Sequence, residues 1–338
     1  MAYQNVGKCR FYIDTISYLK SLGQDYTISF DNDLCRFDPI NQKEIEFDSS
    51  NPQTIVLNSN LLNYFDTDNF YLAFLNHNIE GKIITTTTNS ESVLNCNIET
   101  TESEPLFDVI SIENIGTTIF TGTADSDLST IGLGIAANDD GSQVTQSYNL
   151  GSLIFGSYYD MPSADLELSM EIEFDGFDTL KTMGGSTLTN VRYAGSPYWI
   201  NGESKAAPFS IGDTNEVAKR NGRRVWNLSF SYISDKDLFA SNYMGNNYTE
   251  TTTNYSDDDI DTDNNTNNAF YYNINNDKSF ISQVLNKIGN GQRFLFQPDN
   301  TNNNPDQFAI CVLDQDSLSI SQVAFKTYNI SLKIKEVW

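Results

Sequence analysis

Three segments of the chain alternate apolar and polar residues with a period of two, the pattern of a β-strand that has one face in water. In residues 165–174, Leu, Met, Ile and Phe alternate with Glu and Ser, which gives one apolar and one acidic face. Residues 223–232 and 326–338 repeat the alternation around Trp226 and Ile330. The pattern therefore predicts three strands whose apolar faces turn away from solvent.

Shorter runs with the same period fill the first third of the chain, and they are separated by Asn, Asp and Gly, which favour turns. Tyr, Phe and Thr are frequent in these runs and suit the half-buried surface of a sheet. We therefore predict a mostly β protein built from antiparallel β-sandwich domains. The runs are YTISF (26–30), LCRF (34–37), IEF (45–47), QTIVLN (53–58), YLAFLN (71–76), KIITTTT (82–88) and two further strands within 104–122.

Two segments have the spacing of short helices instead. Residues 14–23 begin at Asp14 or Thr15, either of which can cap a helix, and end at Gly23. Residues 279–288 place Phe, Val, Leu and Ile on one helical face. This second pattern predicts a helix that packs its apolar stripe onto the C-terminal sheet.

A change of composition divides the chain. Residues 123–148 mix Gly, Ser, Asp and Ala with few large apolar residues, which indicates a junction. We predict an N-terminal β-rich domain over 1–135 and a C-terminal β-sandwich with one flanking helix over 150–338. The C-terminal part contains a polar loop, 244–277, that is too long for an ordinary turn. This loop is either a mobile projection or a segment that becomes ordered against a neighbouring subunit.

The charge balance narrows the range of partners. The chain has 20 Lys and Arg against 45 Asp and Glu, a net charge of −25, so nucleic acid and anionic membranes are poor partners. Such acidity suits a protein that stays soluble until it meets a specific partner. The four cysteines form no CxxC pair and are expected to be buried free thiols. The N-terminal residues lack the apolar core of a signal peptide, and no segment approaches the roughly 18 apolar residues that span a bilayer, which predicts folding in a cytoplasm.

Few residues have the arrangement that catalysis or metal binding requires. The single histidine, His77, has no nucleophile motif around it and is expected at a turn or strand end. Residues 257–265 space three aspartates like a calcium loop, but the sixth position is Asn264 and the twelfth is Phe270. Weak cation binding is therefore the most that this acidic segment predicts.

Other motifs have structural interpretations. The acidic side chains of 165–174 share the wet face of one strand, and no opposing acid can be placed to complete a glycosidase pair. The glycines of 132–134 and 183–187 form no nucleotide-binding motif and indicate tight turns. The Asn- and Pro-rich residues 297–306 are expected to connect two strands and to be available for docking. No cofactor is predicted.

The one dense basic cluster, KRNGRR (219–224), stands at the start of the predicted Trp226 strand. Its cations can pair with carboxylates of their own chain or of a neighbour, and both interpretations stay open. Trp199 and the tyrosine pair at 271–272 can stack on a sugar or pack in a core or an interface. The candidate subunit contacts are Lys219, Arg220, Arg223, Arg224, Tyr271 and Tyr272.

The order of elements in the C-terminal half resembles a known group of proteins. The strand GRRVWNLSFSY (222–232) is followed by a polar loop, an amphipathic helix, RFLFQPD, FAICVLD and a last strand that ends in KEVW. This order is similar to that of distal or minor tail proteins of long-tailed bacteriophages, which are built on the tail-tube fold. The block 160–195, with DMPSADLELSMEIEF and TMGGSTLTNVRYAG, is also similar to virion proteins of marine phages. The resemblance covers about 150–338 and rests on element order.

The resemblance implies a β-sandwich with one flanking helix, whose copies join into a ring through sheet edges and long loops. It also implies a further β-domain outside the ring and no catalytic residues. The leading hypothesis is therefore a non-enzymatic virion protein, a tail or baseplate ring component located in the virion and made in the cytoplasm of the bacterial host. Its implied partners are itself and tail-tube, tape-measure, hub or fibre proteins, without nucleic acid or membrane insertion.

Other functions remain open from the sequence. A capsid decoration or head–tail connector protein would use the same kind of fold at another place in the particle. A carbohydrate-binding or receptor-binding module would use the exposed aromatic residues. A glycan hydrolase is the enzyme class to weigh against these, and no catalytic residue is predicted for it.

Overall fold

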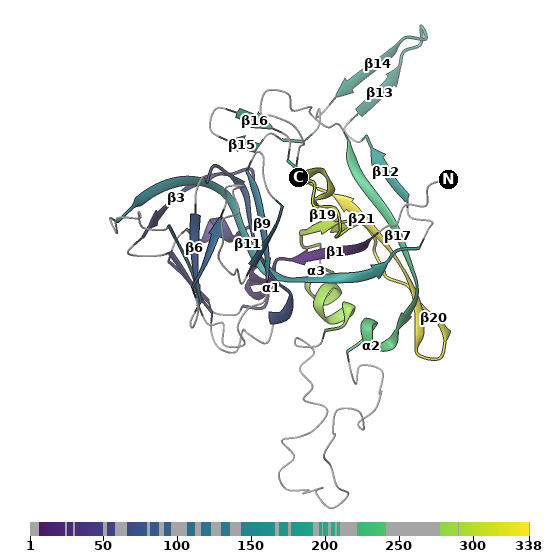
Figure 1. The fold of residues 1–338 in the computed structure, drawn as a ribbon. Helices are drawn as coiled ribbons and strands as arrows, with labels where there is room; N and C mark the ends of the chain where they lie inside the picture. The colour runs from purple at the N-terminus through teal and green to yellow at the C-terminus, as the bar shows by residue number, and fades with distance from the viewer. Residues whose placement is uncertain are drawn as a thin grey trace, which may run out of the picture.

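The described part of the chain is mostly β and is organised around one large antiparallel sheet (Figure 1). This confirms the predicted fold class. The computed structural model describes residues 7–23, 26–29, 31–49, 53–57, 66–79, 82–87, 91–95, 107–111, 116–122, 130–135, 143–165, 169–174, 177–191, 196–197, 199–201, 204–206, 208–209, 222–240, 278–289 and 291–337.

The large sheet has twelve strands among the described residues, and ten of them follow one hydrogen-bonded path. In the order of that path they are β12 (Ser169–Glu173), β17 (Arg223–Ser234), β21 (Thr327–Glu336), β19 (Ala309–Leu313), β18 (Phe294–Gln297), β1 (Lys8–Ile13), β11 (Thr145–Ser163), β5 (Phe70–His77), β9 (Thr117–Gly122) and β8 (Phe107–Ser111). Beside the path, β20 (Ile320–Ala324) pairs with β21, and β3 (Lys43–Asp48) pairs with β11.

Smaller sheets flank this one within the described ranges. A five-stranded sheet has the order β2 (Tyr26–Ile28), β4 (Gln53–Leu57), β10 (Thr130–Ile135), β6 (Lys82–Thr87) and β7 (Glu91–Asn95). Two hairpins complete the set, β13 (Phe177–Lys181) with β14 (Thr187–Val191), and β15 (Trp199–Asn201) with β16 (Ser204–Ala206). Most of the predicted short strands are therefore present.

One predicted strand, LCRF at 34–37, is wrong. The structure has a 3-10 helix at Asn32–Cys35, because the Asp31 side chain accepts a hydrogen bond from the Asp33 backbone N–H at 2.9 Å and starts a helical turn. The burial of Leu34 beside Cys35 then accounts for the apolar residues. The other short helical elements are Thr67–Asn69, Pro305–Gln307 and α2 (Asp235–Leu238).

Both predicted helices are present. In α1 (Thr15–Ser21) the Asp14 side chain caps the first turn by accepting a hydrogen bond from the Ser17 backbone N–H at 3.1 Å. Gly23 ends the segment with a φ of +67°, which an L-residue with a side chain rarely adopts. The second helix is a π-helical segment, Ile281–Leu285, that continues into α3 (Asn286–Ile288).

Two apolar clusters lie on opposite faces of the central strands. The helix-side core lies beneath the second helix, and its side chains include Phe11, Ile13, Phe280, Val284, Ile288, Phe294, Cys311, Trp226, Leu228, Leu332 and Ile334. The joint core lies on the other face and joins the two halves of the chain, with Tyr12, Tyr71, Leu75, Ile119, Ile154, Trp199, Leu295, Phe308 and Ile310 among its members. The central strands are thus buried on both faces.

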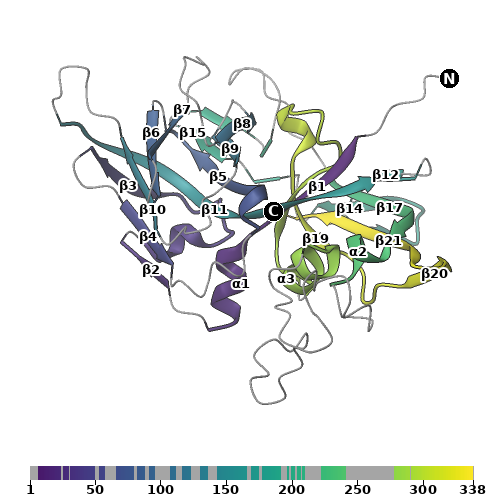
Figure 2. The same ribbon diagram turned by 60° about the horizontal axis from the view of Figure 1, so that its bottom comes forward.

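The sheet does not follow the predicted boundary between 1–135 and 150–338. β1, at the start of the chain, lies between β18 and β11 and pairs with both. β11 is a 19-residue strand that pairs with β1 at one end and with β5 and β3 at the other, so it runs through both halves (Figure 2). The halves therefore share a sheet and the joint core, which the composition change at 123–148 did not indicate.

The Asn- and Pro-rich segment that was expected to connect two strands does so. β18 and β19 form an antiparallel pair on either side of it. The segment is held by its own chain, because Asn300 donates its backbone N–H to the Lys8 carbonyl at 2.8 Å and Gln297 donates its side-chain N–H to the Asn302 carbonyl at 2.9 Å. These contacts make it a structural part of the sheet end.

Candidate docking surface

β12 is an edge strand whose apolar side chains continue the core face of the large sheet. Among the described strands it pairs only with β17, with Met170 opposite Trp226 and Ile172 opposite Arg224. Trp226 is buried in the helix-side core. Directly opposed residues of neighbouring strands lie on the same face of a sheet. Met170 and Ile172 therefore belong to the face that is buried further inside the sheet.

The core ends before it reaches β12. Met170, Ile172 and Phe174 leave 54%, 47% and 62% of their surface exposed. The prediction that the apolar face of 165–174 turns away from solvent is therefore wrong for these residues. The reason is position, because β12 stands at the end of the strand path, beyond the strands that the second helix covers.

A glycine lies against the inner side of the exposed side chains Ile172 and Phe174. Gly222 is buried, and a Cβ atom at this position would lie 2.6 Å from Ile172 Cγ2 and 3.2 Å from Phe174 Cδ1. Its φ of +79° also favours glycine. Ile172 and Phe174 are therefore held in place against the start of β17, with their outer surfaces in solvent.

A two-stranded ribbon follows β12 along the chain and extends away from the body of the molecule (Figure 1). We call residues 177–191 the arm. Its turn is closed by Gly185, which has a φ of +83° and donates its backbone N–H to the Thr182 carbonyl at 2.9 Å. This confirms the tight turn predicted for 183–187, whereas the turn predicted for 132–134 is wrong, because those residues lie inside β10.

The arm carries apolar side chains in solvent. Leu180 lies opposite Leu188 on the two strands, and both are exposed, as is Met183 at the turn. A two-stranded ribbon is marginally stable alone in water. With an exposed apolar pair, the arm has the character of a segment that binds another surface. Together, Met170, Ile172, Phe174, Leu180, Met183 and Leu188 form what we call the arm surface.

The opposite face of β12 is acidic and solvated, as predicted. Glu173 forms an ion pair with Lys335 at 2.6 Å, and Glu171 is exposed on the same strand. On β21, the next strand beyond β17, Lys333 pairs with the Asp314 carboxylate at 2.6 Å, which raises the pKa of that lysine. The two faces of the β12 edge therefore differ, one being apolar and the other charged.

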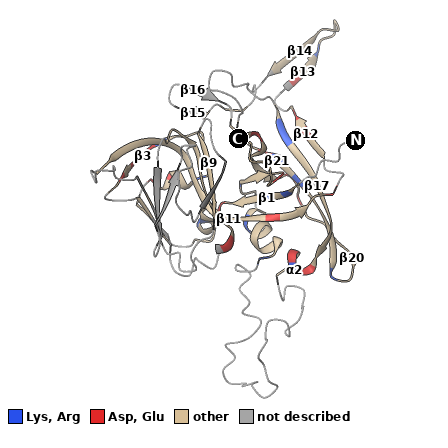
Figure 3. Cartoon of the chain, viewed as in Figure 1, with Lys and Arg blue, Asp and Glu red and all other residues tan. Residues whose placement is uncertain are grey.

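The described part of the basic cluster predicted at 219–224 lies beside this edge, because Arg223 and Arg224 open β17, where Figure 3 shows basic residues. Arg224 is buried and donates from Nε and Nη2 to the two Glu336 carboxylate oxygens at 3.1 and 3.0 Å. It also donates from Nη2 to the Phe308 carbonyl at 2.7 Å, and its guanidinium lies over the Trp226 ring at 5.0 Å.

Arg224 is therefore wrong as a subunit-contact candidate, because its charge is satisfied inside its own chain. Of the two pairings left open from the sequence, the intramolecular one holds for this residue. Arg223 lies opposite Glu173 at the end of β12 and is half-buried. The remaining candidates, Lys219, Arg220, Tyr271 and Tyr272, lie outside the described residues, as do the polar loop 244–277 and the acidic segment 257–265.

Trp199 does not have the exposure that stacking on a sugar requires. It is buried in the joint core, where its ring lies 5.1 Å from that of Phe209.

His77 ends β5 as predicted and is buried, and its Nε2 atom lies 3.0 Å from the Thr118 hydroxyl. Burial lowers the pKa of His77 to about 3, so its ring stays neutral at physiological pH. Both residues are part of the packed interior.

An open cavity of about 470 Å³ lies between α1 and the 3-10 helix Asn32–Cys35, and its lining includes Lys20, Arg36 and Arg293. Arg293 donates from Nη1 to the Phe37 carbonyl at 2.9 Å. Burial raises the pKa of the Cys35 thiol, which keeps it protonated and weakly nucleophilic.

Among the described residues, no group of three or more His, Cys, Asp or Glu is placed to hold a metal ion. Unlike Trp199, His77 and this cavity, the arm surface is suited to binding a protein.

Comparison with protein-family models finds no match for this chain. The comparison with curated proteins finds no match either. No solved structure matches the fold. Among the described residues, no helix is long and apolar enough to cross a membrane.

Reasoning from the sequence did not identify the residues of the arm surface as contacts. The signal that could have found the arm is local: Leu180 and Leu188 flank the MGGST turn, each between two polar residues. For β12 no such signal exists, since its alternation is the same as that of a strand with a buried face. Three of the four cysteines, Cys9, Cys35 and Cys311, are buried free thiols as predicted, and Cys96 lies outside the described residues.

Proposed function

We propose that this chain is a structural protein of a bacteriophage virion, a tail or baseplate ring component that works by self-association and by docking to tail neighbours. The observation that carries the proposal is the arm surface, an apolar sheet edge continued by a projecting ribbon. The virion setting comes from the resemblance of residues 150–338 to phage tail proteins in element order. No catalytic role is part of the proposal.

Hydrophobic burial supports self-association at this surface. Two apolar side chains on β12, Phe174 directly after it and three apolar side chains on the arm are exposed, whereas comparable residues on β17 and β21 are buried. Exposed apolar patches of this kind mark protein–protein contacts. In a ring each copy repeats the same contact, so a modest interface is multiplied by symmetry.

The alternatives differ in how they fit this surface. A capsid decoration or connector protein would use the same edge, and only its place in the particle separates it from a tail component. The carbohydrate-binding alternative loses one of its named candidates, because Trp199 is buried. Its other candidates, Tyr271 and Tyr272, are outside the described residues.

The decisive test is sedimentation velocity of the full chain over a range of concentrations, with negative-stain imaging of the same samples. We expect concentration-dependent assemblies for the natural sequence. The variant L180S/L188S should shift the distribution to monomer, because it removes the apolar pair of the arm. The matched control is T179S/T189S, which changes the pair on the opposite face of the same ribbon and should assemble normally.

A natural chain that stays monomeric at every concentration would contradict the proposal. Location is tested separately by mass spectrometry of purified virions and by labelling the chain in intact particles. Label on the tail supports a tail component, whereas label on the capsid surface selects the decoration alternative. Absence from purified virions would exclude both.

A further inference from the structure

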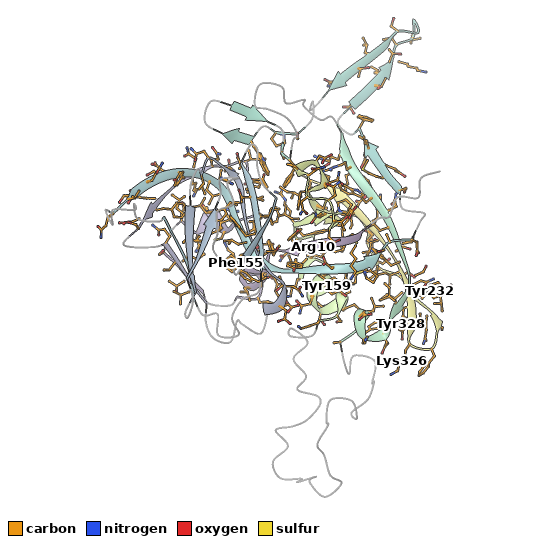
Figure 4. All side chains as sticks on the ribbon, in the orientation of Figure 1. Arg10, Phe155, Tyr159, Tyr232, Lys326 and Tyr328 are labelled. Carbon is orange, nitrogen blue, oxygen red and sulfur yellow. The ribbon has the colours of Figure 1, made fainter. Side chains whose placement is uncertain are left out.

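A second exposed apolar surface lies at the opposite end of β17 from the arm. Tyr232 and Phe325 leave 77% and 85% of their surface exposed, and Val323 on β20, two residues before Phe325, is also exposed. Lys326 follows in the turn between β20 and β21, with its Nζ 5.8 Å from the centre of the Phe325 ring. We call these four residues the β20 tip. Figure 4 shows Tyr232 and Lys326 at this end of the molecule.

The backbone places Tyr232 in solvent by a bulge. The pairing of β17 with β21 shifts register between Phe230 and Ile233, and both of those residues are buried. Tyr232, between them, has a φ of +61°, and its backbone N–H donates to the Asn329 side-chain oxygen at 3.0 Å. A left-handed conformation is unfavourable for an aromatic residue. The fold therefore keeps an aromatic ring outside the core at a conformational cost.

The two surfaces stand at the two ends of one strand. β12 pairs with residues 223–227 of β17, and the bulge lies at 230–233. β17 has 12 residues, which corresponds to roughly 40 Å at about 3.3 Å per residue. Figure 1 shows the arm and β20 projecting at opposite ends of this layer. One surface cannot therefore cover the other within the same molecule.

We infer that the β20 tip is the counter-surface of the arm, so that the arm of one copy docks on the β20 tip of the next copy, head to tail. This inference rests on the proposed self-association and names the two surfaces that make it. A contact between two different surfaces of the same chain is heterologous, and it leaves a free surface of each kind on every dimer. Such a contact continues into rings or filaments, whereas a contact of the arm with itself would stop at a dimer.

Charge supports a contact at these two places. The chain carries a net charge of −25, which repels a second copy over most of its surface. The arm contains one acid and one base, Asp178 and Lys181, and is otherwise uncharged (Figure 3). At the β20 tip, Lys326 and the neighbouring Lys236 balance the charges of Asp235 and Asp237, so this end is also neutral. Two copies meet the least repulsion where both contacting surfaces are neutral.

Charge also disfavours the pairing of two β12 edges. In an antiparallel pair of two β12 strands centred on Ile172, Glu171 of each copy would lie opposite Glu173 of the other. Like charges directly opposite one another destabilise a strand pair. β20 itself, Ile320–Ala324, has no charged residue, so this strand adds no acid to the contact.

Mixing two variants tests the inference. The arm variant is L180S/L188S, and the tip variant is Y232N/F325S, in which Asn tolerates the left-handed conformation of Tyr232. Each variant alone should sediment as a monomer. Their equimolar mixture should form a 1:1 dimer and no larger species, because the intact arm of the tip variant meets the intact tip of the arm variant.

Each outcome has a distinct meaning. A mixture that stays monomeric, or a tip variant that assembles like the natural chain, overturns the inference while self-association stands. A natural chain that does not associate at all overturns the proposed function and this inference with it. Circular dichroism and thermal unfolding show whether both variants fold. The control L22S/I40S changes two exposed apolar residues outside both surfaces and should assemble normally.

Cross-linking gives a second readout that does not depend on weakening the contact. Leu188→Cys in one chain and Val323→Cys in another are mixed and treated with a bismaleimide. The samples are compared at a concentration where the chain is mostly dimeric. We expect cross-linked heterodimers in the mixture. Either variant alone should show only the background cross-linking of the natural chain. Efficient cross-linking of Leu188→Cys to itself would show an arm-to-arm contact and overturn the inference.

Discussion

β12 and β21 lie on either side of β17 in the same sheet, and their apolar side chains have different surroundings. Ile330, Leu332 and Ile334 on β21 are buried, whereas Met170 and Ile172 on β12 are about half exposed. Both strands pair with β17 in antiparallel fashion and alternate with the same period. The difference comes from what lies over them, since the second helix and its core cover β17 and β21 but end before β12.

The comparison shows how one sheet can serve both stability and assembly. Strands in the middle of the path stabilise the fold by burying apolar surface, at roughly 25 cal/mol per Å². A strand at the end of the path has the same apolar face, which stays about half exposed here and which the proposed assembly would bury. The edge and the interior should therefore respond oppositely to substitution, with effects on association at the edge and on unfolding in the interior.

The largest effect on stability is expected at the buried ion pair that joins the start of β17 to the end of β21. Arg224→Ala leaves the Glu336 carboxylate buried without its partner, and should lower the free energy of unfolding by about 3–5 kcal/mol. Denaturant titration measures the loss. The control Arg36→Ala breaks an exposed pair with Asp33 at 3.5 Å and should cost less than about 1 kcal/mol. Equal losses for the two variants would contradict the buried position of Arg224.

A matched pair of isoleucines compares the two strands directly. Ile330→Ala on β21 removes buried methyl groups and should lower the free energy of unfolding by about 2–5 kcal/mol. Ile172→Ala on β12 should cost less than about 1 kcal/mol in the monomer and should weaken association instead. Urea unfolding and sedimentation of both variants test this. If the two losses of stability are similar, β12 is covered in the free chain and the comparison fails.

A pH dependence is expected from a buried lysine in the second helix. Lys287 donates from Nζ to the Gln283 side-chain oxygen at 2.8 Å, and burial lowers its pKa to about 7, with the charge of Asp66 acting in the opposite direction. An unfolded lysine titrates near about 10.4, so between about pH 7 and about 10 the unfolded chain binds more protons than the folded chain. The contribution of Lys287 to stability therefore rises with pH across that window.

Lys287→Met should remove this rise. The measurement is the free energy of unfolding of the natural chain and of the variant at pH 7 and pH 9. The difference between the two proteins isolates the lysine from other groups that titrate in the same range. An identical change with pH in both proteins would show that Lys287 is charged in the folded chain.

The smallest effect is expected at the glycine that packs beneath the edge. Gly222→Ala should lower the free energy of unfolding by about 1 kcal/mol or slightly more, through its positive φ and the contact of the new Cβ with Ile172. Gly185→Ala in the arm is the matched control, because its φ is also positive and no atom lies near the added Cβ. If Gly222→Ala costs no more than Gly185→Ala, Ile172 is free to move and the edge is not rigidly packed.

Much of the secondary structure could be predicted because local chemistry determines it. The cap at Asp14, the stop at Gly23 and the turn at 183–187 each depend on residues within a few positions. The apolar stripe of 279–288 predicts that this helix covers a sheet, and Phe280, Val284 and Ile288 are buried there. LCRF at 34–37 was predicted wrongly because an aspartate cap, which begins a helical turn, outweighed a short apolar run.

The candidate site could be predicted only in part. The sequence pointed to the region of residues 219–224, and Arg224 does lie beside β12, but its charge is used inside the chain. Whether an arginine pairs within its own chain depends on the approach of Glu336, which is 112 residues away. The tip residues Tyr232 and Phe325 gave no sign of exposure, because Tyr232 continues an alternation that the bulge interrupts.

Local residue patterns were sufficient to predict that the chain is mostly β, and where most of its strands and both helices lie. Its strong acidity follows directly from composition. A period of two defines two faces of a strand but does not say what lies over either face. The tertiary structure alone decided that β1 joins the C-terminal strands, that the two halves share a core, and that β12 stands uncovered at the edge. These outcomes depend on pairing between segments far apart in the chain, and such pairing is set by the packing of the whole sheet.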